Sequence, residues 1–156
     1  MSSELPPPPS DLRFGDVTLH FEFIKPGDPE QGFVPAYHFR IHDADGVDVG
    51  RIRFRVGDTP HVTICVGHIG YLVEEDYRGH GYAYMACRAL EPFAFSVLDS
   101  ILITVNPDNP ASIRTIEKLG ATFIDIQTVP EHDPHYASGA RIKRRYRWER
   151  CGGDVE

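Results

Sequence analysis

A short loop with two closely spaced glycines carries the clearest chemical signal in the sequence. The stretch at 73–83 joins an expected strand to an expected helix and contains Gly79 and Gly81. Glycines allow a tight turn, and such a turn at the start of a helix exposes consecutive backbone N–H groups. The helix dipole adds about half a positive charge at the same point. This chemistry favours binding of a phosphate or pyrophosphate.

Other interpretations of the loop stay open on its pattern alone. It is not a dinucleotide-binding fingerprint, because Tyr84 occupies the position of the third glycine. It also lacks the Gly-Lys-Ser/Thr sequence of a Walker loop. An ordinary strand-to-helix connection would use the same residue types, and an unrelated nucleotide-binding domain is a further alternative.

The elements that must position this loop follow from the period of the apolar residues. Strands are expected at 17–23, 37–41, 47–56, 61–73, 101–105, 123–129 and 142–148, and helices at 82–97 and 110–119. Phe21 and Phe23 are expected on the buried face of the first strand. A strand–helix–strand unit needs a crossover, so the strands on either side of the first helix should run parallel in one mixed sheet. The order predicts an α/β or α+β fold.

The alternation of apolar residues changes phase at two glycine positions. It moves from odd to even numbers after Gly50, and from even to odd numbers after Gly67 and His68. A period of two cannot change phase without an extra residue, so both positions predict a β-bulge. A bulge can leave backbone amides free for a ligand, or it can be purely structural. Pro92 is expected to kink or divide the first helix.

The length of 156 residues fits one domain, expected at 13–150. A poorly ordered proline-rich arm is expected at 1–12 and a tail at 151–156. Hydrophobic residues make up 41% and charged residues 25%, which excludes a wholly disordered chain. No apolar run could span a bilayer, and no secretory signal is visible. Three scattered cysteines favour neither a disulfide framework nor a zinc site, so a reduced, cytoplasmic protein is expected.

The net charge of −7 argues against nucleic acid or an anionic membrane as a partner. The segment 141–150 is an exception, because it carries six bases and one acid. In the last strand Ile142, Tyr146 and Trp148 are expected on one face, with Lys143 among the bases on the other. These bases either form one solvated face or help to hold an anionic ligand.

Around the glycine loop the sequence resembles a known enzyme superfamily. Arg78-x-x-Gly81-x-Ala83 is similar to the Arg/Gln-x-x-Gly-x-Gly/Ala loop of the GNAT N-acetyltransferases. A second block, at 106–112 and then Glu-Lys-Leu-Gly at 117–120, resembles the Rim-type branch, which acetylates N-terminal amines of ribosomal proteins. The two motifs occur in the family's order and spacing, and the resemblance covers about residues 67–124.

The resemblance implies a mostly antiparallel mixed sheet, a central V-shaped pair of parallel strands, and flanking helices. Acetyl-CoA, the implied co-substrate, would lie in the V between the strands at 69–73 and 101–105. Its pantetheine arm would bind the backbone amides of Leu72 and Val73 and contact Asn109. Its pyrophosphate would bind the loop amides, contributed by Arg78, Gly79, His80, Gly81, Tyr82 and Ala83. The acceptor amine would attack the thioester directly in a ternary complex, while a bulge amide polarises the carbonyl.

The sequence departs from the family pattern at the residues that move protons. A tyrosine that many members use as an acid corresponds to Ile116, and a glutamate that some use as a base corresponds to Thr104. The remaining candidates are Ser112, as proton donor, and His68, as base or water relay. Each also has a structural interpretation, because Ser112 could support a helical turn and His68 could be an ordinary strand histidine. The His-Asp-Pro-His stretch at 132–135 lacks further ligands at suitable spacing, so a loop and no metal are expected.

A site with a weak base favours an acceptor amine of low pKa. At pH 7 a lysine amine is neutral in about one molecule in 2,500, whereas an α-amine is neutral in about 10–15%. The expected acceptor is therefore a peptide α-amine or a small-molecule amine, in a pocket formed by the loops at 26–35, 57–61 and 130–140. A homodimer is a further expected partner. The alternative to an enzyme is a CoA-binding module without catalysis, which Thr104 and Ile116 favour.

Overall fold

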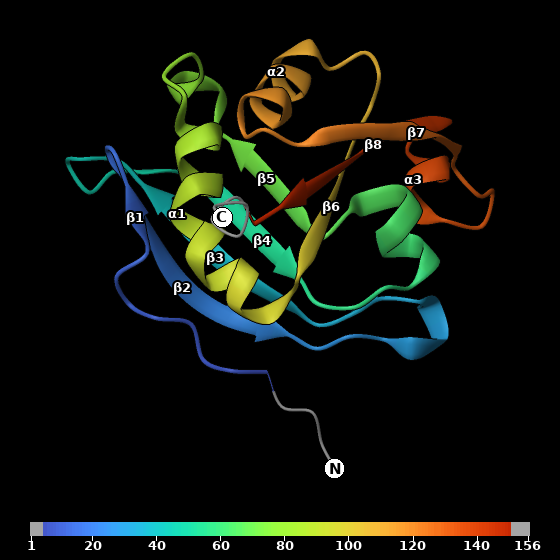
Figure 1. Cartoon of the computed structure of the whole chain (residues 1–156), viewed down its shortest axis with the longest axis horizontal. Coiled ribbons are helices and arrows are strands. Elements are labelled where there is room, and N and C mark those ends of the chain that lie inside the picture. The colour runs from blue at the N-terminus through green and yellow to red at the C-terminus, as the bar shows by residue number, and fades with distance from the viewer. Residues whose placement is uncertain (1–4, 151–156) are drawn as a thin grey trace, which may run out of the picture.

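A computed structural model of the chain describes residues 5–150. The expected tail at 151–156 and the first four residues of the expected arm lie outside this range. The strands form two antiparallel sheets, with β1 to β5 in one and β6 to β8 in the other (Figure 1). Three short helical segments connect them: η1 (Pro29–Gln31), η3 (Glu75–Tyr77) and α3 (Pro134–Ala137). The α+β class and the predominance of antiparallel strands are confirmed.

The larger sheet has its strands in sequence order, each antiparallel to the next. They are β1 (Arg13–Phe14), β2 (Val17–Lys25), β3 (Ala36–His42), β4 (Asp48–Arg55) and β5 (Ile69–Val73). The bulge predicted near Gly50 is confirmed, because Ile41 pairs with Gly50 while the next residue, His42, pairs with Asp48. Val49 is the extra residue. Its insertion lets both Val49 and Ile52 point into the core.

The bulge predicted near Gly67 and His68 is wrong. The segment before it is a single helical turn, η2 (His61–Val66), and the pairing of β4 with β5 runs without a shift. The apolar residues that suggested a strand include Val62 and Cys65, which are buried at helical spacing. The change of phase marks the end of this turn at Gly67, whose positive φ of 72° suits glycine.

The smaller sheet has the order β6 (Ser100–Val105), β8 (Ile142–Glu149), β7 (Thr122–Thr128). Among the described residues no ladder joins β5 to β6, so the expected single mixed sheet is two sheets. The contact between them is local: His68 N–H donates to Leu102 C=O (2.8 Å), and Leu102 N–H donates to His68 Nδ1 (2.9 Å). Because the imidazole takes the Leu102 N–H, the two strands diverge from this point into a V (Figure 1).

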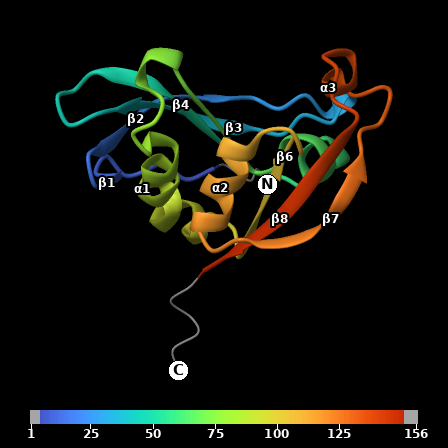
Figure 2. The ribbon, with the colours of Figure 1, turned by 90° about the horizontal axis from the view of Figure 1, so that it is seen from above.

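Two helices lie on the same side of the larger sheet (Figure 2). They are α1 (Tyr82–Val97), which leads from β5 to β6, and α2 (Pro110–Lys118). Pro92 does not divide α1, because Leu90 and Phe93 beside it are buried and hold the helix against the sheet. Asn109 caps α2 as expected, since its side chain accepts a hydrogen bond from Ser112 N–H (3.1 Å).

The core lies between the helices and the two sheets, with Trp148 and Tyr37 among its largest buried side chains. Phe21 and Phe23 are exposed, contrary to expectation. The register of β2 shifts between them, which takes Phe23 out of phase with Val17 and Leu19. In the described part of the expected arm, Leu12 is buried and Pro6 C=O accepts a hydrogen bond from the Tyr37 hydroxyl. Residues 5–12 therefore pack on the domain. Within 5–150 no helix has the length and apolar character to cross a bilayer.

Candidate active site

The divergence of β5 and β6 leaves a cleft of about 210 Å³ between the sheets. The cleft is lined by residues from β4, η2, β5, β6, α2, the segment before α2, α3 and β8. The lining residues with polar side chains that could bind a ligand or take part in a reaction are Arg55, Cys65, Tyr71, Thr104, Asn106, Asn109, Ser112, His135 and Lys143. This is the position at which the sequence places the acetyl group and its acceptor.

One edge of β5 faces this cleft and the other pairs with β4. Glu74 N–H donates to Val49 C=O (2.9 Å) just beyond the end of the ladder. Hydrogen-bonded pairs alternate along antiparallel strands, so the Leu72 N–H is directed at β4, while those of Tyr71 and Val73 lie on the free edge. Of the two amides expected to hold the pantetheine arm, Val73 is available and Leu72 is not. Tyr71 supplies the second free amide.

The glycine loop has the geometry of an anion site. Gly79 and Gly81 have positive φ values of 91° and 78°, and both are exposed. Gly81 is the N-cap residue of α1. Because it has no side chain, no side chain caps the first N–H groups of the helix. The Arg78 guanidinium turns back and donates to Val73 C=O (2.9 Å). Arg78 therefore anchors the loop, while His80, Tyr82 and Ala83 supply backbone around it.

Tyr71, expected only as an apolar residue of the strand at 61–73, lies beside Ser112 in the cleft. The Tyr71 hydroxyl, from β5, lies 2.5 Å from the Ser112 Oγ of α2. Burial raises the pKa of the Tyr71 phenol, so it stays protonated at neutral pH and can donate. The expected proton donor Ser112 is thus half of a hydroxyl pair. Ile116, at the family's usual tyrosine position, is fully buried.

His68, the expected base, lies outside the residues that line the cleft. Its Nδ1 accepts from Leu102 N–H, so Nε2 carries the proton in the neutral ring and donates to Asp58 Oδ1 (3.1 Å). Its side chain is almost completely buried. Neither ring nitrogen has a lone pair free for an amine proton, and this arrangement favours the structural interpretation. Thr104 is also engaged, because its hydroxyl donates to Cys65 C=O (2.8 Å).

The start of β5 is surrounded by ionisable groups that the sequence did not bring together. Asp133, expected in a plain loop, precedes the short helix α3, and its carboxylate contacts His61 Nδ1 (2.6 Å). Burial alone would raise the pKa of Asp133, but hydrogen bonds from His61, the His135 N–H and Cys65 outweigh it and the pKa is lowered. Possible ligand atoms of His61, Cys65 and Asp133 lie within 4.8 Å of one another. The absence of a metal stays a prediction.

Lys143 corrects a second expectation about this region. Of the two interpretations of the bases on the last strand, a solvated face does not hold for Lys143, which is 6% exposed, whereas Ile142, expected on the apolar face, is 42% exposed. The reason is that Lys143 lies beyond the end of β6, where β8 pairs with β7 alone and its cleft-facing side closes over η2 and α3. Of the neighbouring bases, Arg145 pairs with Asp125 (2.8 Å) and also donates to Thr63 C=O (3.0 Å).

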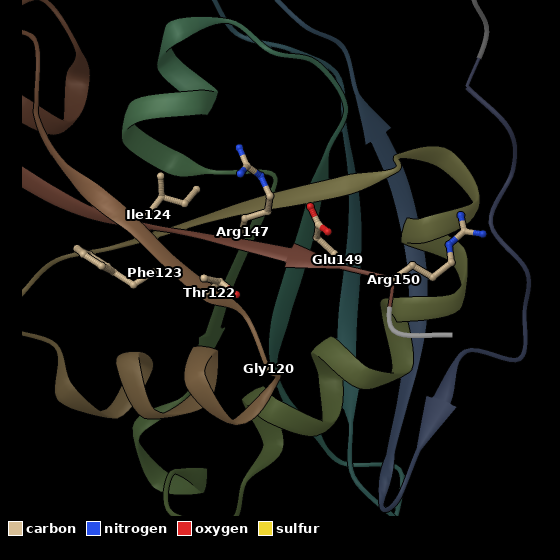
Figure 3. Close-up of a pocket in the computed structure, with 7 residues that line it drawn as sticks. All are labelled: Gly120, Thr122, Phe123, Ile124, Arg147, Glu149 and Arg150. Atoms are coloured by element: carbon tan, nitrogen blue, oxygen red, sulfur yellow. The ribbon is translucent and has the colours of Figure 1, made fainter. Parts of the chain in front are cut away.

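A larger hollow of about 600 Å³ lies where α2 leads into β7 and β8 ends (Figure 3). Its lining residues are Gly120, Thr122, Phe123, Ile124, Arg147, Glu149 and Arg150. None of these belongs to the expected site, and the hollow has no paired groups for proton transfer. In Figure 3 the Arg147 and Arg150 side chains point away from each other rather than toward a common ligand. The smaller cleft is therefore the candidate active site.

Comparison with known proteins agrees with this geometry. A sequence model of the acetyltransferase (GNAT) domain matches residues 10–122, which is most of the chain. The chain belongs to the GNAT family. No curated protein matches it in a search by sequence. The acyltransferase class and the GNAT-like fold follow from this membership.

Solved GNAT structures are similar to the chain in fold. An acetyltransferase from Agrobacterium tumefaciens matches at 20% identity with a TM-score of 0.62, over 96% of this chain and 100% of that one. Ribosomal-protein-S5-alanine acetyltransferase from Vibrio fischeri matches at 20% identity with a TM-score of 0.59, over 78% of this chain and 64% of that one. RimL, a ribosomal L7/L12 α-N-protein acetyltransferase in complex with coenzyme A, matches at 18% identity with a TM-score of 0.55, over 73% of this chain and 62% of that one. The chain thus spans less than two thirds of the ribosomal-protein enzymes it resembles.

Proposed function

We propose that this protein transfers the acetyl group of acetyl-CoA to a primary amine by direct attack in a ternary complex. One observation carries the proposal: a helix start suited to an anion and a free edge of β5 lead, in that order, to a cleft that holds a pair of hydroxyl groups. The coenzyme A in the RimL structure supports the choice of co-substrate. The acceptor is a peptide α-amine or a small-molecule amine.

The described residues fit acetyl-CoA at two points. The loop at 78–83 offers backbone N–H groups to the pyrophosphate, and a Cβ built on Gly79 meets nothing within 4 Å, so the space beside it is open. The free edge of β5 offers the N–H groups of Tyr71 and Val73 to the pantetheine amides, which then add to the sheet as an extra strand would. Asn109 contributes at the cleft wall, where its side chain also caps α2.

The chemical step needs three contributions from the protein. The cleft holds the neutral amine against the thioester carbonyl. A free β5 N–H polarises the carbonyl oxygen as the carbon–nitrogen bond forms. The carbon–sulfur bond then breaks, and the Tyr71–Ser112 pair delivers a proton to the departing thiolate. The proton that the amine loses passes to water, because His68 and Thr104 are both engaged in structural hydrogen bonds.

The experiment combines binding with turnover. Calorimetry measures acetyl-CoA binding, and release of free thiol with a panel of amines measures transfer, with mass spectrometry to identify the acetylated product. Binding together with thiol release that depends on an added amine supports the enzyme. Acetyl-CoA binding without transfer to any amine would contradict it and favour the alternative, a CoA-binding module, which the engaged His68 and Thr104 make the second candidate. A thermal shift with nucleotides but none with CoA would contradict both.

A further inference from the structure

Two cationic side chains line the cleft near the start of β5, at the opposite end of that strand from the glycine loop. Arg55 reaches the cleft from β4 and Lys143 reaches it from β8. The pair lies beyond the hydroxyls of Tyr71 and Ser112 as one follows β5 away from the loop. A molecule that offers its amine at those hydroxyls would therefore place its own body against these two cations.

Lys143 is a buried charge without a partner. It is 6% exposed, and among residues 5–150 its ammonium has neither a hydrogen bond nor an ion pair. In the described part of the chain, Arg53 Nε is the sole polar side-chain atom that is both fully buried and unpaired. The unpaired Lys143 Nζ is therefore partly accessible to solvent. The ammonium is thus open to the cleft, and a buried unpaired charge is costly unless a ligand completes it.

Arg55 is held so that part of its guanidinium stays available. Its Nη1 donates to the carbonyls of Val66 and Gly67, each at 3.2 Å, while Nε and Nη2 have no partner among the described residues. Gly70 makes room for the group, since a Cβ there would lie 3.1 Å from Nη1. No described carboxylate forms an ion pair with Arg55. Burial and the neighbouring Arg53 lower the pKa of Arg55 to about 10, as expected for a cation lacking a counter-ion.

Asp133, a buried carboxylate in this region, does not neutralise the pair. The Asp133 oxygens accept from His61 and from the His135 N–H (2.9 Å), and no ion pair joins Asp133 to Lys143. Burial lowers the pKa of Lys143 despite the opposing fields of Cys65, Asp133 and Asp108. The cleft therefore carries an excess of positive charge inside a protein whose net charge is −7.

We infer that Arg55 and Lys143 form a subsite for an anionic group on the acceptor, so that the substrate is an amine that also carries a carboxylate. Resting on the function proposed above, this narrows the acceptor to amino acids and to peptides whose first residues are acidic. Charge-assisted hydrogen bonds from an ammonium and a guanidinium to one carboxylate would hold the acceptor in a fixed direction, with its amine toward Tyr71 and Ser112.

The test offers amines in pairs with and without an anionic group. Rates are compared per neutral amine at the assay pH, because a neighbouring anionic group also raises the pKa of the amine. Each amino acid is compared with its amide, beginning with glycine and glycinamide, and phosphoethanolamine is compared with ethanolamine. We expect the acid to be used with a kcat/KM about 10- to 100-fold above that of its amide, the range set by hydrogen bonds to charged groups. A preference confined to the phosphate pair supports the anionic subsite and assigns it to phosphate. Equal use of both members, or preference for the neutral one, would overturn the inference.

Lys143→Met removes the ammonium and keeps an unbranched chain of similar length. We expect it to abolish the preference by raising KM for the acid far more than KM for the amide. Lys25→Met, which removes an exposed lysine at the end of β2, is the matched control and should keep the preference. Lys143→Gln serves the same purpose should the methionine variant fail to fold. A preference that survives in either folded Lys143 variant would contradict the subsite.

A binding measurement separates this inference from the proposed function. N-acetylglycine and N-acetylglycinamide are titrated into the protein saturated with CoA. Tighter binding of the acid, lost in Lys143→Met, supports the subsite even when no amine is acetylated, and in that case the proposed function alone fails. Equal binding of the two, or none of either, would overturn the subsite whether or not the protein is an active enzyme.

Discussion

The two ends of the cleft are built in different ways. The proposed cofactor end is a continuous stretch, 71–83, that offers backbone N–H groups and open glycines. The acceptor end brings together side chains from four separate places, including Arg55, Cys65, His135 and Lys143. A backbone site accepts one ligand chemistry and tolerates exchange of the side chains around it. A side-chain site depends on each residue present, so differences in acceptor between related chains should arise at this end.

The largest effect is expected at the cofactor end, from Gly81→Glu. The new side chain carries negative charge to the helix start where the pyrophosphate binds, so acetyl-CoA binding should be abolished. Gly139→Glu is the matched control, because Gly139 also has a positive φ, of 109°, with nothing within 4 Å of its Cβ position. The strain is comparable, and the control should bind acetyl-CoA normally in calorimetry. Unchanged affinity in a folded Gly81→Glu protein would contradict the assignment of the loop.

The middle of the cleft should separate catalysis from binding. Tyr71→Phe and Ser112→Ala each break the hydroxyl pair, and we expect kcat to fall about 10²- to 10⁴-fold, as is typical of a positioned proton-transfer group. Acetyl-CoA affinity should stay nearly constant, because both variants keep the β5 backbone. Steady-state kinetics and calorimetry on the same preparations give the two readouts.

A control on α2 decides whether Ser112 acts as a proton donor or as structure. Asn109→Ala removes the cap of the helix and should cost about 1 kcal/mol of stability. If Ser112 only supports the same turn, Ser112→Ala should lose a similar amount of stability and keep its full kcat. That result would leave Tyr71 alone as the donor. A full kcat in Tyr71→Phe as well would contradict the hydroxyl pair altogether.

The difference between the two ends also explains what the sequence could reveal. The glycine loop, the Asn109 cap and the strands around them depend on neighbours within a few residues, so local patterns predict them. Lys143 becomes part of the cleft only because β8 extends past β6 to face η2 and α3. No periodicity within 141–150 contains that information, and the alternation there suggested a solvated lysine.

The prediction of a strand at 61–66 was wrong for a related reason. The apolar residues of this segment fit a strand and a single helical turn equally well, because a segment of six residues is too short for the two periods to differ. Contact with β6 decides the outcome: Gly67 lies so close to the backbone of Leu102 and Thr104 that any Cβ would collide with it. Tyr71 was missed because a strand tyrosine at an apolar position carries no sign that its hydroxyl meets a partner from α2.

A smaller effect is expected at the junction of the two sheets. His68→Ala leaves the Leu102 N–H without its acceptor in a buried place, which should cost about 1–3 kcal/mol of unfolding free energy. Chemical denaturation measures this loss, and kcat of the folded protein should fall far less than in Tyr71→Phe. A large loss of kcat with a changed pH profile and normal stability would instead show that His68 acts as a base.

The smallest effect concerns an ion pair that fastens the acceptor end. Arg145 holds Asp125 in two hydrogen bonds, at 2.8 and 2.9 Å, and these lower the pKa of Asp125 to about 2.

A carboxylate whose pKa is lower in the folded state adds stability above its unfolded pKa of about 3.9, and that stability disappears as the pH falls through the folded value. The contribution should therefore be complete above about pH 5 and be lost below about pH 2. Because the pair is partly exposed to solvent, this contribution to stability should be modest. Asp125→Asn should flatten the loss of stability between pH 4 and pH 2 in urea titrations, while Asp99→Asn, an exposed aspartate before β6, should not. An identical acid limb in Asp125→Asn and the parent protein would show that Arg145 fastens η2 through Thr63 alone.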